Sequence, residues 1–271
     1  MKVLQIVWKE LKASKKGILI YTALMSLFYL WFVSIYDPEF MANFNEIMEG
    51  YPEAIRHMVG EYFSLATFGG FVNVYLLSMS FFFFGVYFIL KSSQDIPKEI
   101  ENKTIDLMLS RPITRMELTL GKYLYHIIGA NIVLGSVFLS ILLGIFIMPN
   151  VNPVNVNFKE LWTAFFIILL FNYAIISTAF FFSTFNTPKM ALVFSFGIVV
   201  FFYAIGQFWK SFNENIQNIK YISIFYYSDM SNLLVNSNWG DVPLKIGFFA
   251  MYILILTITA IIIFNKRDIP V

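Results

Sequence analysis

The chain has 271 residues, of which 58% are hydrophobic and only 13% are charged. Soluble domains carry roughly 25% charged residues, so this composition excludes a globule with a water-facing surface and indicates a protein that folds in a lipid bilayer. The formal net charge of +2 argues against a nucleic-acid partner. The absence of cysteine excludes disulfides, thiolate metal sites and a cysteine nucleophile.

Residues 1–16 have the pattern of an amphipathic helix. One helical face is apolar and the remainder carries lysines; the apolar set is Leu4, Val7, Trp8 and Leu11. Such a helix is expected to lie in the cytoplasmic headgroup layer, although the lysines could also be a positive flank that only fixes topology. The apolar run from Gly17 is too long for a signal peptide and lacks a small-residue cleavage site, so it is predicted to be the first membrane span.

Six apolar stretches have the length of about 20 residues that a helix needs to cross the hydrocarbon core. They cover residues 17–36, 68–90, 122–148, 161–184, 189–209 and 243–264. No internal repeat or low-complexity linker divides the chain. We therefore predict an all-α membrane protein with about six spans and a single domain over residues 1–271.

The distribution of Lys and Arg predicts the orientation of these spans. With the N-terminus in the cytoplasm, fourteen of the 19 basic residues fall in cytoplasmic segments and five in outer segments. The positive-inside rule therefore places both termini in the cytoplasm and the protein in the cell membrane, which requires an even number of spans. Of the outer segments, 37–67 is acidic, and 210–241 contains an apolar stretch at 222–227 that is predicted to pack on the helices or dip into the interface.

Residues 91–121 form a charged cytoplasmic loop that is too long for a simple connection and too short for a domain. Asn102 and Thr104 can cap a helix, and the run 105–109 is apolar apart from Asp106. A short helix with an exposed apolar face is predicted here. That face could lie on the membrane surface or insert into a groove on a cytoplasmic partner, and the pattern alone favours neither.

The same loop is predicted to end in a turn and a new helix. Pro112 cannot continue a helix and restricts the conformation of Arg111 before it. Thr114 can then cap the next helix, with Glu117 three residues later as its capping-box partner. This helix is expected to run on into the third span.

The order of these features resembles the signature of ABC-2 type transporter permeases. Along the loop stand an acidic pair at Glu99 and Glu101, Lys103-Thr104, a leucine-rich turn, Pro112-x-x-Arg115 and Gly121-Lys122. The ending at 264–268 and the segment 221–227 before the last span are also similar to that family. The resemblance covers the six spans and essentially the whole chain.

The resemblance implies a coupling helix that sits in a groove of a separate ATP-hydrolysing subunit and transmits its closure to the spans. It implies a docking face at Thr104, Ile105, Asp106 and Leu109, an acidic pair at Glu99 and Glu101 near the gate helix, and a return shaped by Pro112 and Arg115. Asn102 and Lys103 depart from the Arg-Gly that is common before the threonine. The implied assembly is an exporter with two permease subunits, identical or different, and two ATPase subunits.

The sequence contains no catalytic motif. Gly121-Lys122 lacks the upstream glycine and the following Ser or Thr of a phosphate-binding loop, so ATP and Mg are expected on the partner and no cofactor on this chain. His57 and His126 are the only histidines, which disfavours a metal site or histidine catalysis. His126 is predicted to be a packing or interfacial residue, and the protein is predicted not to be an enzyme.

Charged residues are nearly missing from the predicted spans, which disfavours an ion-driven pump. Asn73, Asn131 and Asn172 could line a substrate path, but each is more typical of an interhelical hydrogen bond. A small-x-x-x-small stripe from Ser136 through Ser140 to Gly144 predicts close packing of the third span against another helix.

Two other function classes stay open. A membrane-embedded lipid-modifying enzyme would need a cluster of His, Asp or Glu near one interface, for which the acidic outer segment is the only candidate. A channel, immunity or scaffold protein would have no ATPase partner and would tolerate substitutions in the loop.

Overall fold

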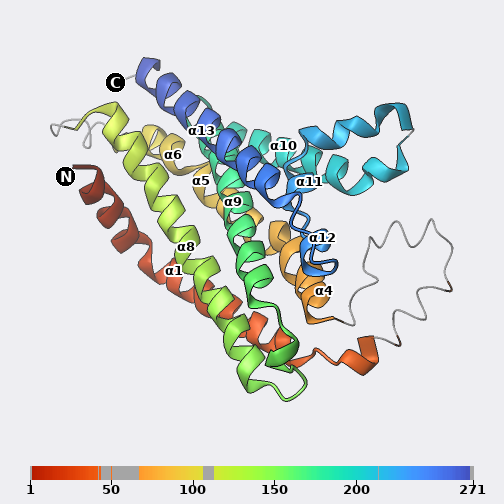
Figure 1. The fold of residues 1–271 in the computed structure, drawn as a ribbon. Coiled ribbons are helices and arrows are strands. Elements are labelled where there is room, and N and C mark those ends of the chain that lie inside the picture. The colour runs from red at the N-terminus through yellow and green to blue at the C-terminus, as the bar shows by residue number, and fades with distance from the viewer. Residues whose placement is uncertain are drawn as a thin grey trace.

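The computed structural model describes residues 2–41, 43, 50, 67–105, 113–212 and 214–268, and within them all regular structure is helical. Five long helices form the body of the bundle (Figure 1). They are α1 (Lys2–Ser34), α8 (Arg115–Ile147), α9 (Phe158–Ser183), α10 (Pro188–Phe208) and α13 (Val242–Lys266). Each is apolar and long enough to cross a membrane. The predicted all-α membrane fold is confirmed.

Shorter helical elements connect these five. The connections before α8 are α4 (Phe68–Val72), the π-helical η2 (Asn73–Ser78) and η3 (Phe81–Gly85), α5 (Val86–Ser92) and α6 (Asp95–Glu101). The later ones are η4 (Pro153–Asn155), η5 (Trp209–Ser211), η6 (Glu214–Ile222), α11 (Ile224–Ser228) and α12 (Ser231–Leu234).

The predicted second span is a succession of helical pieces rather than one regular helix. From Phe68 to Ser92 the chain passes through α4, two π-helical segments and α5. Figure 1 shows this succession running from the α4 end of the bundle toward the end that carries both termini. The π-helical turns break the regular i→i−4 hydrogen-bond pattern, so no single piece has the length of a span. A sixth crossing by this segment stays a prediction.

The N-terminal segment differs from the expectation. The structure shows no boundary at Gly17, because residues 2–34 form one unbroken helix of 33 residues. Its first turns pack against α8: Ile6 and Val7 are buried, whereas Leu4 and Trp8 on the predicted apolar face are exposed. The expected separate interfacial helix is therefore the first part of α1, held by a neighbouring helix.

Close contact along α1 and α8 depends on glycines of α8. A Cβ added at Gly121 would lie 2.8 Å from Cβ of Ile6, and one added at Gly144 would lie 2.8 Å from Cγ1 of Val33. Both helices have 33 residues, which is about 50 Å and exceeds the hydrocarbon core of about 30 Å. The close packing predicted for the stripe that ends at Gly144 is confirmed at that residue.

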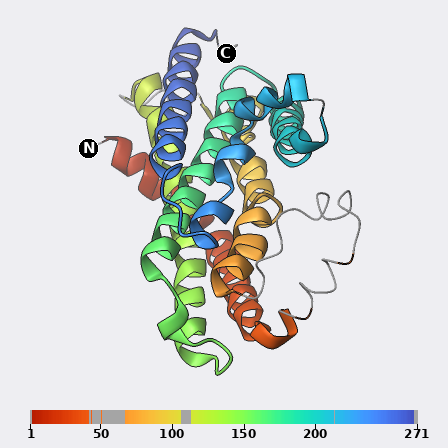
Figure 2. The same cartoon turned by 45° about the vertical axis from the view of Figure 1, so that its right-hand side comes forward.

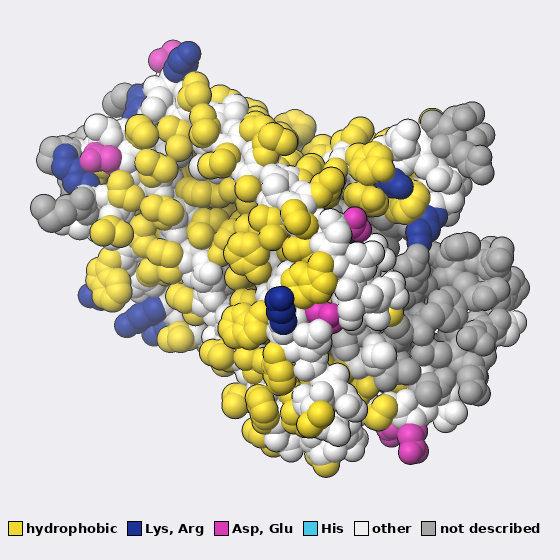
Figure 3. All heavy atoms as spheres, viewed as in Figure 1, with side chains coloured by type: hydrophobic (Ala, Val, Ile, Leu, Met, Phe, Trp, Pro, Cys, Tyr) yellow, Lys and Arg dark blue, Asp and Glu magenta, His cyan; other side chains and the backbone are white. Residues whose placement is uncertain are grey.

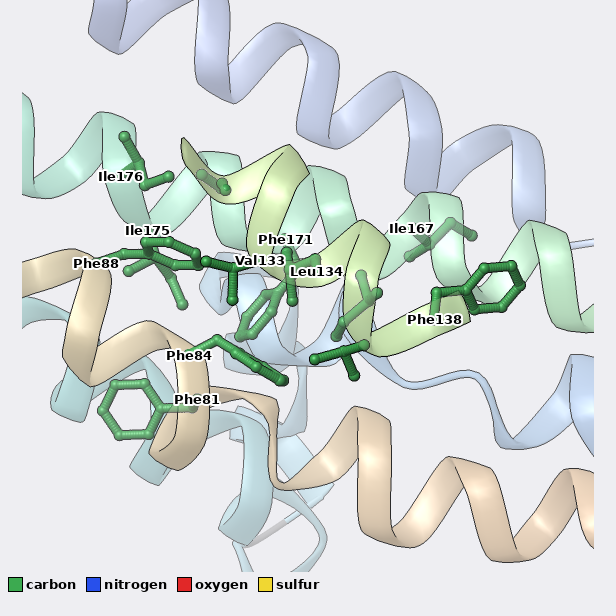
Figure 4. Packing of buried hydrophobic residues seen from close by; sticks show 14 of the residues in the cluster. Phe81, Phe84, Phe88, Val133, Leu134, Phe138, Ile167, Phe171, Ile175 and Ile176 are labelled. Carbon is green, nitrogen blue, oxygen red and sulfur yellow. The ribbon is translucent and has the colours of Figure 1, made fainter. Parts of the chain in front are cut away.

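Helix α9 runs through the middle of the bundle and contributes much of its core. Phe171 and Ile175 of α9 meet Phe84 from the interrupted segment and Val133 from α8 (Figure 4). These four side chains are at most 1% exposed. The three elements therefore share one hydrophobic core.

The apolar stretch before the last helix folds back into the bundle. Ile224, Phe225 and Tyr227 of α11 are buried, and the Phe225 ring lies edge-on to Phe171 of α9 at 5.0 Å between centroids. Ser223 donates a hydrogen bond of 2.5 Å to the Phe202 carbonyl of α10. The prediction that this segment packs on the helices is confirmed for these residues.

Both termini lie toward the same end of the bundle in both ribbon views (Figures 1 and 2). On the face shown in Figure 3, hydrophobic side chains cover most of the helices, and Lys and Arg gather near that end. This arrangement agrees with an even number of crossings.

We predict that Gly144→Leu separates α1 from α8, because the new side chain meets Val33 where even a Cβ has no room. Overpacking of this kind costs about 1–3 kcal/mol. Thermal unfolding of the detergent-purified protein measures the effect. Gly135→Leu is the matched control, because nothing lies within 4 Å of a Cβ at that position on the same helix. Equal melting temperatures for the two variants would contradict the close contact.

Candidate functional site

Helix α6 forms the described first half of the predicted cytoplasmic loop. Its first turn contains Asp95 and Pro97, a favourable start for a helix because Asp interacts with the helix dipole and Pro lacks only an N–H that would be unpaired there. Two backbone bonds close its other end: Lys103 N donates to the Ile100 carbonyl at 3.1 Å, and Thr104 N to the Glu99 carbonyl at 2.9 Å. This pair is a Schellman motif.

The Schellman motif explains the unusual backbone of Lys103. The residue after the helix cap must adopt a left-handed conformation, and Lys103 has φ of 56°. Glycine takes this conformation without steric cost. Lys103 therefore occupies the position at which the ABC-2 signature commonly has Gly.

A fully enclosed lysine ties α6 to two other helices. Lys122 of α8 has no exposed side-chain surface, and its Nζ lies 2.9 Å from Asp95 Oδ1 and 2.9 Å from Glu99 Oε1. Glu10 Oε1 of α1 lies 3.7 Å from the same nitrogen. The second Asp95 oxygen lies 3.0 Å from Nε2 of His126, one turn further along α8. We call these five residues the ion cluster.

The ion cluster holds more acid than base. Three carboxylates share one ammonium group, and His126 adds a second positive charge only when protonated. Burial opposes ionisation of Asp95, but the Lys122 charge and the His126 hydrogen bond outweigh it and hold the pKa of Asp95 well below its usual range. Burial raises the pKa of Glu99, although Lys122 acts in the opposite direction. Asp95 is therefore the more strongly ionised of the two α6 partners of Lys122.

A polar hollow opens beside the ion cluster. It has a volume of about 530 Å³ and is lined from three sides by α1, the α5–α6 region and α8. Glu10, Asp95 and Glu99 supply carboxylates to its wall, and Lys91 and Lys98 supply ammonium groups. Tyr125, also in the wall, donates a hydrogen bond of 2.8 Å to Ser14 of α1. Asn73, Asn131 and Asn172 lie elsewhere.

A second link joins the start of α8 to the C-terminal ends of α13 and α9. Nη1 of Arg115 donates to the Arg267 carbonyl, directly after α13. Nη1 of Arg267 donates in turn to the Thr184 carbonyl, directly after α9, at 2.9 Å. Three helix ends are therefore connected through two guanidinium groups.

The comparison with protein families agrees with this arrangement. The model of the ABC-2 family transporter proteins matches residues 4–269, nearly the whole chain. No curated protein sequence matches the chain.

The chain belongs to the ABC-2 family transporter proteins.

It is a multi-pass membrane protein and a permease component of an ABC transporter. Members of this family are membrane transport subunits that are not themselves catalytic. The described part of this permease holds no group of three His, Asp or Glu side chains placed to bind a metal ion.

The structure separates the coupling residues that the ABC-2 resemblance implies. Glu99 joins the ion cluster, whereas Glu101, two residues later on α6, is exposed. Thr104 is exposed and its hydroxyl donates to the Glu99 carbonyl at 3.2 Å. Ile105 is only 1% exposed, so it supports the loop from within the permease and offers no open contact to another chain in this conformation.

The rest of the implied docking segment lies outside the described residues, which resume at 113. Asp106, Leu109 and Pro112 belong to it, so their roles stay predictions. The helix that follows begins as predicted: Thr114 and Glu117 form a capping box, with Thr114 Oγ1 accepting from Glu117 N at 3.1 Å and Thr114 N donating to Glu117 Oε2 at 2.8 Å.

The three intramembrane asparagines are dispersed in the permease. Asn172 is fully buried, and its amide donates to Ser80 Oγ at 3.0 Å, which is an interhelical hydrogen bond. Asn131 is exposed and donates to its own helix at the Ile127 carbonyl. Asn73 is buried and its Oδ1 has no partner among the described residues. Lining of a substrate path by these residues stays a hypothesis.

Sequence reasoning missed Glu10, Asp95, Lys122 and His126 as one site. Spacing gave part of the signal, because Asp95 and Glu99 lie one helical turn apart, as do Lys122 and His126. The convergence of α1, α6 and α8 comes from tertiary packing and carries no local pattern.

We predict that Lys122→Met destabilises the permease by about 1.5–3 kcal/mol, because it leaves two partly buried carboxylates without their counter-ion. Thermal unfolding measures the loss. Lys15→Met, at an exposed position of α1, is the control and should leave the melting temperature unchanged. Adding Asp95→Asn and Glu99→Gln to Lys122→Met should recover part of the stability. A Lys122→Met variant that melts with the control contradicts the role given to the ion cluster.

Proposed function

We propose that this chain is the membrane permease of an ABC exporter and that a separate ATPase subunit drives it through the segment between α6 and α8. One observation carries the proposal: Lys122 binds α6 to α1 and α8 at the end of the bundle that carries both termini. A movement of this segment and α6 would therefore be transmitted to the long helices α1 and α8.

The segment between α6 and α8, called the driving segment below, is fixed at both ends by local hydrogen bonds, which supports this role. On one side the Schellman motif ends α6 at Thr104, and on the other the capping box starts α8 at Thr114. Residues 105–113 connect two anchored helix ends. A partner that moved this connection would displace α6 and α8 together, which is a rigid-body type of conformational change.

The charge distribution supports a cytoplasmic position for this end of the bundle. Lys and Arg are enriched in the segments assigned to it, as the positive-inside rule requires for the cytoplasmic side of a cell membrane. A cytoplasmic ATPase could then reach the segment. Exposed apolar faces on α1, α10 and α13 provide surface for lipid and for a second permease subunit.

The docking prediction concerns Leu109, on the apolar run of the segment. Leu109→Glu should abolish co-purification with the partner ATPase, because a charge would enter an apolar contact. Val154→Glu is the matched control, since Val154 is 88% exposed between α8 and α9 and lies outside the segment. Recovery of equal amounts of ATPase with both variants would remove Leu109 from the docking face.

The transmission prediction concerns Arg115, which links the start of α8 to the ends of α13 and α9. Arg115→Gln should leave ATPase binding intact but lower the stimulation of ATP hydrolysis by the permease at least tenfold, the effect of losing a hydrogen bond from a charged donor worth roughly 1.5–3 kcal/mol. The assay compares ATPase turnover with and without permease in nanodiscs.

Lys189→Gln, at an exposed position near the start of α10, serves as the control for charge. If Arg115→Gln stimulates the ATPase as strongly as the control does, force does not pass through this link. Loss of ATPase binding in Arg115→Gln would instead show that the residue belongs to the docking face.

A further inference from the structure

We propose that Glu99 of α6 is a proton-binding site and that its proton sets how firmly α6 is held to α8. The inference concerns the ion cluster of the permease alone, so it stands independently of the ATPase coupling proposed above. Three features support it: the excess of carboxylates in the cluster, the surroundings of the Glu99 carboxyl, and the contact of this side chain with water.

The ion cluster contains more carboxylates than its ammonium group can balance. Glu10, Asp95 and Glu99 each have an oxygen between 2.9 and 3.7 Å from Lys122 Nζ. If all three were ionised, two negative charges would stay uncompensated as long as His126 is neutral. Carboxylates that share a partly buried site raise one another's affinity for protons. The cluster is therefore expected to take up a proton more readily than an isolated carboxyl.

Glu99 is the member of the cluster whose charge is least supported. Asp95 has a partner on each oxygen, Lys122 on one and His126 on the other. In Glu99, Oε1 lies 2.9 Å from Lys122 Nζ, whereas Oε2 is buried and has no hydrogen-bond partner among the described residues. Glu10 has no oxygen that is both enclosed and unpartnered.

A proton on Oε2 of Glu99 removes this cost. Burying an ionised oxygen without a donor is more costly than burying a neutral hydroxyl. The other oxygen, Oε1, stays free to accept from Lys122. Burial raises the pKa of the Glu99 carboxyl, and although Lys122 opposes this rise, Asp95 and Glu10 add to it. The direction of the shift agrees with the contacts.

The remaining charged groups near Glu99 do not balance the cluster. Lys91 and Lys98 line the hollow beside it, but both are exposed, so water and salt screen them, and neither forms an ion pair with the cluster as the structure describes it. Tyr125, in the same wall, is an uncharged phenol. Helices α9 and α10 also contact α6, and their ends nearest to it contribute Lys189, which is exposed.

Protons reach the site from the hollow. The Glu99 side chain is 17% exposed and lines this open space of about 530 Å³. Because folding raises the pKa of Glu99, the stability that its proton contributes is present below the ordinary value of about 4.3 and is lost as the pH rises through the folded value. Loss of the proton adds repulsion toward Asp95, so α6 is held more firmly to α8 at lower pH.

Infrared spectra of the full-length permease, purified in a detergent without carbonyl groups, test the proposal. A protonated carboxyl has a C=O stretch that is separate from the carboxylate bands. The unmodified protein should keep one such band above the pH at which exposed carboxyls, whose ordinary pKa is about 4, have lost theirs. Glu99→Gln should remove this band. Glu101→Gln, at an exposed position of the same helix, is the control and should retain it.

Two further variants locate the proton within the cluster. Asp95→Asn should shift the loss of the band downward by about one pH unit, a tenfold lower proton affinity, because a neighbouring negative charge is removed. This shift tests the proposal even if Glu99→Gln fails to fold. His126→Gln should leave the band in place. Loss of the band in His126→Gln would assign the proton to the imidazole pair and overturn the proposal.

Thermal unfolding provides a second measurement. Gln copies the neutral form of Glu, so the melting temperature of Glu99→Gln relative to the unmodified permease should rise steadily with pH, whereas that of Glu101→Gln should show no such trend. A difference for Glu99→Gln that does not change with pH would overturn the proposal. So would the absence of a titrating carboxyl band in the unmodified protein, or its persistence in Glu99→Gln.

Discussion

A buried ammonium group shared by three carboxylates is the constraint around which this end of the permease is built. Removing Lys122 from water is costly, and only close contacts with ionised partners compensate for it. Those partners come from α1 and α6, which lie far from Lys122 in sequence. Any arrangement that separated α6 from α8 would leave charge buried without a partner, so these elements are constrained to move together.

The body of the bundle is held by other means, because charge is scarce there and lipid offers little hydrophobic driving force between helices. Glycines let α1 and α8 approach closely at Gly121 and Gly144. Helix α9 instead uses hydroxyls and an amide: Ser177 bonds Tyr123 of α8 at 2.8 Å, and Thr178 bonds Tyr252 of α13 at 2.8 Å. Backbone proximity and short hydrogen bonds thus replace ion pairs within the membrane.

Local sequence rules predicted what depends on local structure. Composition and hydropathy predicted the all-α membrane fold, and the Thr114–Glu117 capping box was found as predicted because both partners lie within one helical turn. Residues 1–16 were expected to form a separate interfacial helix, but they are the first part of one unbroken helix that packs along α8. The interrupted structure of residues 68–92 and the ion cluster depend on contacts between distant segments, which no periodicity in the sequence reports.

The two sets of contacts near the start of α8 differ in strength, and this difference indicates which helices hold together most firmly. The α6 link consists of ion pairs to a fully buried lysine, whose disruption is costly. The Arg115–Arg267–Thr184 link consists of hydrogen bonds from two partly buried guanidinium groups to backbone carbonyls, each contributing roughly 1.5–3 kcal/mol because the donor is charged. Helices α1, α6 and α8 therefore form the stiff unit. The ends of α9 and α13 are where that unit can shift relative to the rest of the bundle.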